Sequence, residues 1–221
     1  MCGRYTFVET KELKKRFKLL NDVEGLTPRY NVAPGQMMPV IIKKENVVAE
    51  VMRWGLIPHW AKDPKIGYRM INARAESLME KPSWRQPFLT SRCLVPASGF
   101  FEWQHQNGRQ PYYIRVKNQP IFAFAGLTDT WLDAENRPLR TFTIITTTAN
   151  EVVSTLHDRM PVIIRQSDEL RWLDPMNQDT ESLRQLLKPY TSEETVIYPV
   201  TTEVNNPKND NKSVLKDIEL L

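Results

Sequence analysis

Residues that form disulfides, bind metals or cross membranes are scarce in this sequence of 221 residues. It contains two cysteines and three histidines, at spacings that match no zinc-site template. Two cysteines give no disulfide framework, which is typical of a reducing compartment. No apolar run reaches the roughly 18 residues of a membrane span, and no signal-peptide pattern opens the chain. We therefore expect a soluble, cytoplasmic protein with no metal, no cofactor and no membrane anchor.

The sequence also lacks internal repeats, low-complexity segments and Pro/Gly/Ser-rich linkers. Its length is sufficient to bury a core without staples, so we predict one domain over residues 1–221. The formal charge of +4 and the pI of about 9.0 are mild. They are compatible with a basic face that attracts phosphate, but charge alone favours an ordinary solvated surface.

Apolar patterning and turn residues predict a chain rich in β-strands. We predict strands at 39–42, 47–54, 100–105, 111–116, 120–126, 139–148, 161–164 and 195–200, with a hairpin turn at Asn107-Gly108. Short helices or helical turns are predicted at 11–20, 76–80, 86–92, 150–157, 168–173 and 180–188, and a turn-rich loop at 30–35. The pattern indicates an α+β fold with a mostly antiparallel, barrel-like sheet and short surrounding helices.

Of the two cysteines, the one at position 2 carries distinctive chemistry. Cys2 directly follows the initiator methionine, which is normally trimmed before a small residue, so we expect a mature chain that begins with a free amine and a thiol on one residue. The amine titrates near 7.7–8.0 and is partly nucleophilic at neutral pH. It can condense with an aldehyde, after which the thiol closes a five-membered thiazolidine. Cys93 lies in an apolar run and is predicted to be an inert buried thiol.

Three other interpretations of Cys2 compete with this one. Cysteine could occur there by chance, or in a disordered terminus without a function. A lipoprotein cysteine needs an apolar stretch before it, and one methionine cannot supply that. The third is an N-terminal nucleophile hydrolase, in which the amine is the base for its own side chain.

Four further segments combine residue types that can carry chemistry. Each also has a structural explanation: Phe101 and Trp103 alternate around Glu102 on a predicted strand, and this spacing alone favours a solvated carboxylate. His157 ends a predicted helix, where the dipole favours a histidine. The segments are Trp54-Gly55-Leu56-Ile57-Pro58-His59-Trp60, Ile71-Asn72-Ala73-Arg74-Ala75-Glu76, Gly99-Phe100-Phe101-Glu102-Trp103 and His157-Asp158-Arg159-Met160-Pro161.

Together with Met1-Cys2-Gly3-Arg4 and Tyr30-Asn31-Val32-Ala33-Pro34, these segments resemble the SRAP family, the SOS response-associated peptidase domain. The six motifs occur in the family's order, and the resemblance extends from Cys2 to about Val200. Members of this family cross-link covalently to abasic sites in single-stranded DNA.

The resemblance implies a role for four residues in the reaction. Cys2 would attack the ring-opened deoxyribose aldehyde through its amine and close the thiazolidine through its thiol. Glu102 would move protons during ring opening and imine formation, for which a raised pKa is suited. His157 would assist proton transfer to the sugar hydroxyl, and Asn72 would orient the Cys2 amine and the linked sugar.

The resemblance also implies a DNA-binding surface. Arg4 and Arg74 would contact flanking phosphates, and Trp60 would stack on or wedge beside a base next to the lesion. Trp54 is the alternative for the exposed ring, with Trp60 then in the core.

Asn31 and Pro34 would shape the wall of the same DNA-binding pocket, whereas Arg159 could contact phosphate or pair with a carboxylate. The expected partner is single-stranded DNA with an abasic site, bound by a monomer that is cytoplasmic and associates with the nucleoid when on DNA. The rival functions are a peptidase or amide hydrolase using Cys2, Glu102 and His157, and a non-covalent single-strand binder.

Overall fold

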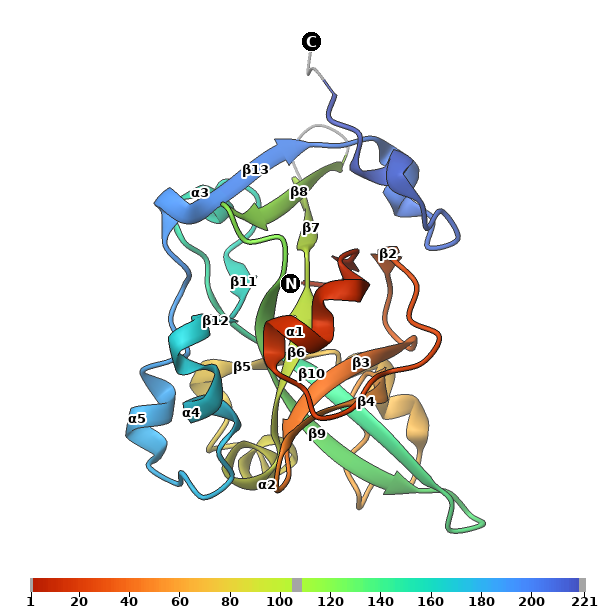
Figure 1. Ribbon diagram of the computed structural model, residues 1–221, viewed down its shortest axis with the longest axis vertical. Coiled ribbons are helices and arrows are strands. Elements are labelled where there is room, and N and C mark those ends of the chain that lie inside the picture. The colour runs from red at the N-terminus through yellow and green to blue at the C-terminus, as the bar shows by residue number, and fades with distance from the viewer. Residues whose placement is uncertain (1, 105–108, 219–221) are drawn as a thin grey trace.

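A computed structural model describes residues 2–104 and 109–218 and has an α+β fold, as predicted (Figure 1). The predicted Asn107-Gly108 turn falls outside the described residues. The helices are short: α1 (Leu13–Phe17), α2 (Pro82–Thr90), α3 (Glu151–Ser154), α4 (Glu169–Leu173) and α5 (Thr180–Arg184). The strands are β1 (Tyr5–Phe7), β2 (Arg29–Val32), β3 (Met37–Lys43), β4 (Val47–Trp54), β5 (Asn72–Arg74), β6 (Arg92–Ala97), β7 (Gly99–Gln104), β8 (Gln110–Val116), β9 (Phe122–Leu132), β10 (Pro138–Thr148), β11 (Arg159–Pro161), β12 (Ile163–Ile164) and β13 (Thr195–Pro199).

The larger sheet closes on itself. Strands pair in the ring β10-β4-β3-β6-β9 and back to β10, while β5 and β11 also pair with β10, and β12 pairs with β9. Only the β4 and β5 pairings with β10 are parallel among those described. Closure leaves no free edge within the ring and encloses a core of apolar side chains.

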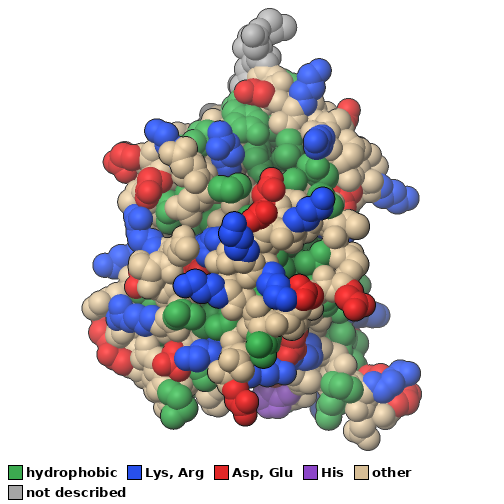
Figure 2. All heavy atoms as spheres, viewed as in Figure 1, with side chains coloured by type: hydrophobic (Ala, Val, Ile, Leu, Met, Phe, Trp, Pro, Cys, Tyr) green, Lys and Arg blue, Asp and Glu red, His purple; other side chains and the backbone are tan. Residues whose placement is uncertain are grey.

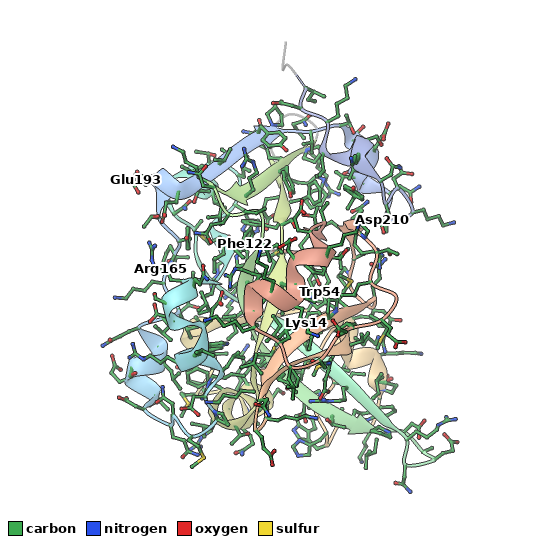
Figure 3. All side chains as sticks on the ribbon, viewed as in Figure 1. Lys14, Trp54, Phe122, Arg165, Glu193 and Asp210 are labelled. Atoms are coloured by element: carbon green, nitrogen blue, oxygen red, sulfur yellow. The ribbon has the colours of Figure 1, made fainter. Side chains whose placement is uncertain are left out.

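The smaller sheet has the order β13-β8-β7-β1-β2 and lies above the barrel in Figure 1. Aromatic side chains join the two sheets: the Tyr5 ring of β1 meets Trp54 of β4 edge-on at 5.2 Å and Phe124 of β9 at 5.9 Å. Trp54 and Phe122 are labelled among the interior side chains in Figure 3. This packing fixes β1, and with it the N-terminal end of the chain, against the barrel.

A second, smaller core lies on the other face of β7 and β8. It contains Phe101, Tyr113, Val200, Val204 and Val214, so the segment after β13 covers that face. The small sheet is therefore buried on both sides, and a side chain on either face of β7 can be excluded from water.

The described residues contain no helix that is both long and apolar enough to cross a membrane. Lys and Arg side chains are interspersed with acidic ones on the face shown in Figure 2, so the net charge of +4 is not gathered there into one block.

Candidate active site

Cys2 lies in the interior because β1, the strand that follows it, pairs with β7. Tyr5 pairs with Phe100 and Thr6 with Gly99 in antiparallel register, and the backbone N–H of Phe101 donates to the carbonyl of Arg4 at 3.0 Å. Continuing this register brings the chain before Arg4 alongside Glu102. Cys2 is fully buried at that point.

Burial dominates the chemistry of the Cys2 thiol. It raises the pKa of the Cys2 thiol well above its ordinary value, and the nearby Glu102 carboxylate raises it further. The Sγ atom lies 3.9 Å from the carbonyl oxygen of Arg4, the geometry of a weak hydrogen bond from a neutral thiol. The thiol is therefore protonated at neutral pH and is a poor nucleophile in this state.

Glu102 is also buried, with 3 % of its surface exposed, so the solvated carboxylate that spacing alone favoured is wrong. Phe101 belongs to the small core and Trp103 packs against it, while Phe100 on the opposite face belongs to the main core. Glu102 shares the face of Phe100 because side chains alternate along a strand. Burial raises the pKa of Glu102, and the Asp158 carboxylate adds to the rise.

The side chain of Asn72 connects the barrel to Cys2. It begins β5, where it pairs with Ile144 of β10, and its Nδ2 donates to the carbonyl oxygen of Cys2 at 2.8 Å. Its Oδ1 is buried without a hydrogen-bond partner among the described residues. An amide held in this way has an acceptor available for an amine or a hydroxyl beside Cys2.

The segment after α3 brings His157 and Asp158 toward the same place. The predicted helix was too long, because α3 ends at Ser154 and His157 lies in the turn that follows. His157 Nδ1 lies 3.0 Å from the backbone nitrogen of Arg159 and 2.8 Å from the Asp158 carboxylate. The influence of Asp158 on Glu102 shows that this turn lies within electrostatic range of the buried carboxyl.

The sequence allows two partners for Arg159, a phosphate or a carboxylate. In the structure Arg159 pairs with a carboxylate. Its Nη1 and Nη2 donate to the two oxygens of Glu76 at 2.8 and 2.9 Å, and Nη2 also donates to the carbonyl of Thr146. The contact joins the start of β11 to the segment after β5 across the end of β10. It thereby links the parts of the chain that carry His157 and Asn72.

Arg4 and Asn31 form a clamp on the C-terminal segment. Arg4 Nη1 donates to Asn31 Oδ1 at 2.8 Å and to the carbonyl of Val204 at 2.9 Å. Asn31 is fully buried, and its Nδ2 donates to the carbonyls of Val204, Asn206 and Asn209. Both side chains thus hold residues 204–209 in place, and Asn31 lies behind the surface while Pro34 is half-buried at it.

The remaining predicted contacts lie at the surface. The Trp54 ring is 1 % exposed and donates its Nε1 to the carbonyl of Ile71, whereas Trp60 is 54 % exposed. Trp60, not Trp54, therefore presents its ring to solvent. Arg74 is exposed at the end of β5, two residues after Asn72.

Two buried hydroxyls near the site were not anticipated from the sequence. Tyr5 Oη and Thr143 Oγ1 are buried and have no hydrogen-bond partner among the described residues. Burial raises the pKa of the Tyr5 hydroxyl, and the nearby Cys2 thiol raises it further. Thr143 precedes the residue of β10 that pairs with Asn72. The only sequence signal that could have indicated these buried hydroxyls is the alternation of side chains along a strand, and β1 was not predicted as a strand. No cluster of three or more His, Cys, Asp or Glu side chains that could hold a metal occurs in the described ranges.

Fold and site together define a class: an α+β barrel protein in which a buried carboxyl and a carboxamide converge on a cysteine at position 2. The chain belongs to the SRAP family, since the family model described as SOS response associated peptidase (SRAP) matches residues 1–207.

Curated relatives and one solved structure are similar to this chain over nearly its whole length. The abasic site processing protein YoqW of Bacillus subtilis is 46% identical, over 98% of this chain and 99% of its own. The abasic site processing protein HMCES of Gallus gallus is 34% identical, over 87% of this chain and 67% of its own. A crystal structure of a protein from Bacteroides thetaiotaomicron superposes with a TM-score of 0.90 at 32% identity, covering 99% of this chain and 100% of that one.

Proposed function

We propose that this protein reacts with abasic sites in single-stranded DNA and shields them as a thiazolidine formed by Cys2. The names of its relatives, abasic site processing proteins, support the substrate. The convergence of Glu102 and Asn72 on Cys2 supports the reaction, and it is the observation on which the proposal rests. The reaction requires removal of Met1, because an amide nitrogen cannot form an imine.

The chemistry balances without a cofactor. The Cys2 amine adds to the aldehyde carbon C1′ of the ring-opened deoxyribose, and the carbinolamine loses one water to give an imine. The thiol then adds across the C=N bond, with its sulfur to C1′ and its proton to nitrogen. The product differs from the reactants by one water.

The site chemistry favours an amine that acts first and a thiol that acts last. A thiol whose pKa is raised by burial is mostly protonated, which suits addition to an imine already in place better than opening attack on an amide. This disfavours the rival amide hydrolase, which needs a thiolate at the first step.

Glu102 is the proposed proton carrier of the reaction. Its raised pKa lets it donate a proton at a higher pH than an ordinary glutamate does, which suits the opening of the sugar ring and the loss of water. Asn72 orients Cys2 through the bond to its carbonyl. His157 assists proton transfer to the sugar hydroxyl from the turn after α3.

Arg74 and Trp60 are the proposed contacts with DNA. Both are exposed, so a phosphate and a base can reach them without rearrangement. Arg4 has one nitrogen committed to Asn31 and Val204, so its contribution to phosphate binding is smaller than that of Arg74. We propose that the protein acts as a monomer, because one lesion accommodates one active site. We also propose that it acts in the cytoplasm.

Intact mass spectrometry tests the proposal, before and after incubation with a single-stranded oligonucleotide carrying one abasic site. The expected result is a protein without Met1 that gains the mass of the oligonucleotide less one water. Cys2→Ala should gain nothing, and a variant that retains Met1 should also gain nothing. A protein without Met1 that stays unmodified, or a stable adduct on Cys2→Ala, would overturn the proposal.

A further inference from the structure

The connection between β4 and β5 exposes two aromatic rings, Trp60 and Tyr68. Trp60 is 54 % and Tyr68 63 % exposed. Exposed rings of this size on one loop are unusual for a surface that meets only water. Trp60 is already assigned above to a base beside the lesion, whereas Tyr68 has no assigned role.

Tyr68 is held in place despite its exposure. The guanidinium carbon of Arg53 lies 5.1 Å from the centroid of the Tyr68 ring. A Cβ built on Gly35 would lie 3.7 Å from Cε1 of the same ring. The ring is therefore supported by a cation and by backbone, as in a preformed stacking platform.

The loop that carries these rings is closed at its base. The backbone N–H of Leu56 donates to the carbonyl of Met70 at 3.1 Å. Gly55 has a φ of +114°, and a Cβ there would lie 2.5 Å from the carbonyl oxygen of Gly67. Only glycine permits this approach, so the loop presents its side chains from a fixed frame.

Basic side chains line a hollow beside the Trp60 ring, and Arg53 lies over the Tyr68 ring. Trp60, Lys62, Lys65 and Arg69 line one hollow of about 310 Å³, together with Ala61, Asp63 and Ile66. The three basic side chains outnumber the one carboxylate of the hollow, Asp63, which also accepts a hydrogen bond from the backbone nitrogen of Lys65. Aromatic rings interleaved with cations are the arrangement that binds single-stranded nucleic acid.

The same loop leads directly into the candidate active site. Asn72, whose side chain contacts the Cys2 carbonyl, follows Tyr68 by four residues. A chain of that length spans at most about 14 Å. A strand with its abasic nucleotide at Cys2 therefore has Tyr68 within reach of the neighbouring nucleotides.

We propose that Trp60, Lys62, Lys65, Tyr68 and Arg69, the 60–69 surface, bind the single-stranded DNA that adjoins the abasic nucleotide. Tyr68 stacks on a base, and Lys65 and Arg69 contact phosphates. The inference rests on the proposed function for the position of the lesion, but binding of undamaged DNA tests it separately.

Fluorescence anisotropy with an undamaged single-stranded oligonucleotide measures this binding. The double variant K65E/R69E is compared with R184E/K188E, an equal charge change in residues also four apart. Arg184 ends α5, which Figure 1 shows far from the 60–69 surface. We expect the first pair to raise Kd at least about tenfold and to reduce the slope of log K against log salt by about 1.4, the effect of two phosphates. We expect the second pair to change Kd by less than about twofold, as distant surface charges do at physiological salt.

Tyr68→Ala should raise Kd by about tenfold, and Tyr68→Phe, which keeps the ring, should bind as the native protein does. Equal losses in the two charge pairs, or native binding by Tyr68→Ala, would overturn the inference. Adduct formation is followed by mass in the same samples. A native protein that binds undamaged DNA in this pattern but forms no adduct would overturn the proposed function and leave the 60–69 surface supported.

Discussion

The two cysteines of this protein are equally buried in one apolar core but differ in their polar neighbours. Cys93 sits on β6 opposite Gly126 of β9, among apolar side chains of the barrel core, and burial is the only cause of its raised thiol pKa. Cys2 belongs to the same core but also has polar neighbours: burial and then the Glu102 carboxylate raise the pKa of its thiol, and Asn72 donates to its carbonyl. Burial raises the pKa of both thiols and so keeps both protonated at neutral pH. In the proposed reaction, the polar neighbours and an amine on the same residue distinguish Cys2 from Cys93.

The strongest test of this comparison removes each sulfur in turn. Cys2→Ala should lose the abasic-site adduct completely, because no thiol remains to close the ring. Cys93→Ala should form the adduct at the native rate and differ only in stability. Gel mobility of a labelled abasic oligonucleotide measures both, and loss of the adduct in Cys93→Ala would contradict the contrast drawn here.

Glu102→Gln tests whether the neighbours of Cys2 are as important as the sulfur. The amide keeps the shape of the carboxyl but cannot move a proton, so the rate of adduct formation should fall by about 10²–10⁴-fold. Glu45→Gln, at an exposed position, is the matched control and should react as the native protein does. A Glu102→Gln rate within about threefold of native would assign the proton transfers to another group, since general acid–base groups contribute far more.

Cys93→Ser probes the apolar surroundings of Cys93 in the barrel core. A hydroxyl placed among the side chains around Cys93 finds few partners, so the variant should lose about 1–3 kcal/mol of unfolding free energy. Cys2→Ser should lose less, because Asn72, whose amide contacts the Cys2 carbonyl, has an Oδ1 without a hydrogen-bond partner among the described residues that can accept a hydroxyl proton. Urea unfolding measures both values, and equal losses would mean that the two environments are alike.

The smallest expected effect is a pH dependence of stability. Burial raises the pKa of Glu102 in the folded state, so the folded chain binds this proton more tightly than the unfolded chain, whose pKa is about 4.3. Stability is therefore lost as the pH rises from that value through the raised pKa. Glu102→Gln lacks this loss, and its Tm relative to the native protein should rise by roughly a few degrees between about pH 4 and 7. A difference in Tm that is constant with pH would contradict the burial of the charge.

Much of the fold was predictable because long strands carry a clear pattern. The strand at 47–54 was predicted with the bounds of β4, and the strands at 111–116 and 139–148 agree with β8 and β10 to within one residue. The short strands β1, β2 and β5 were missed, since three or four residues show no period and form only when a partner strand is present. β6 was also missed, because all of its residues are buried and its sequence does not alternate between apolar and polar side chains.

The candidate site was harder to predict than the fold. The alternation around Glu102 was correct, but the strand pattern does not reveal that both faces of β7 are covered. The main core covers the face of Phe100 and Glu102, and residues 200–214 cover the face of Phe101. The clamp of Arg4 and Asn31 joins residues about as far apart as the chain allows. Local sequence holds no signal for such contacts, and they follow only from the complete topology.

That clamp has a consequence for how the protein is made. Arg4 reaches the carbonyl of Val204, and Asp210, labelled in Figure 3, accepts from the backbone nitrogens of Tyr30 and Asn31. Synthesis proceeds from the N-terminus, so a nascent chain still attached to the ribosome lacks these partners until residues 204–210 emerge. The end of the chain that carries Cys2 is thus the first to be translated and among the last to reach its finished surroundings.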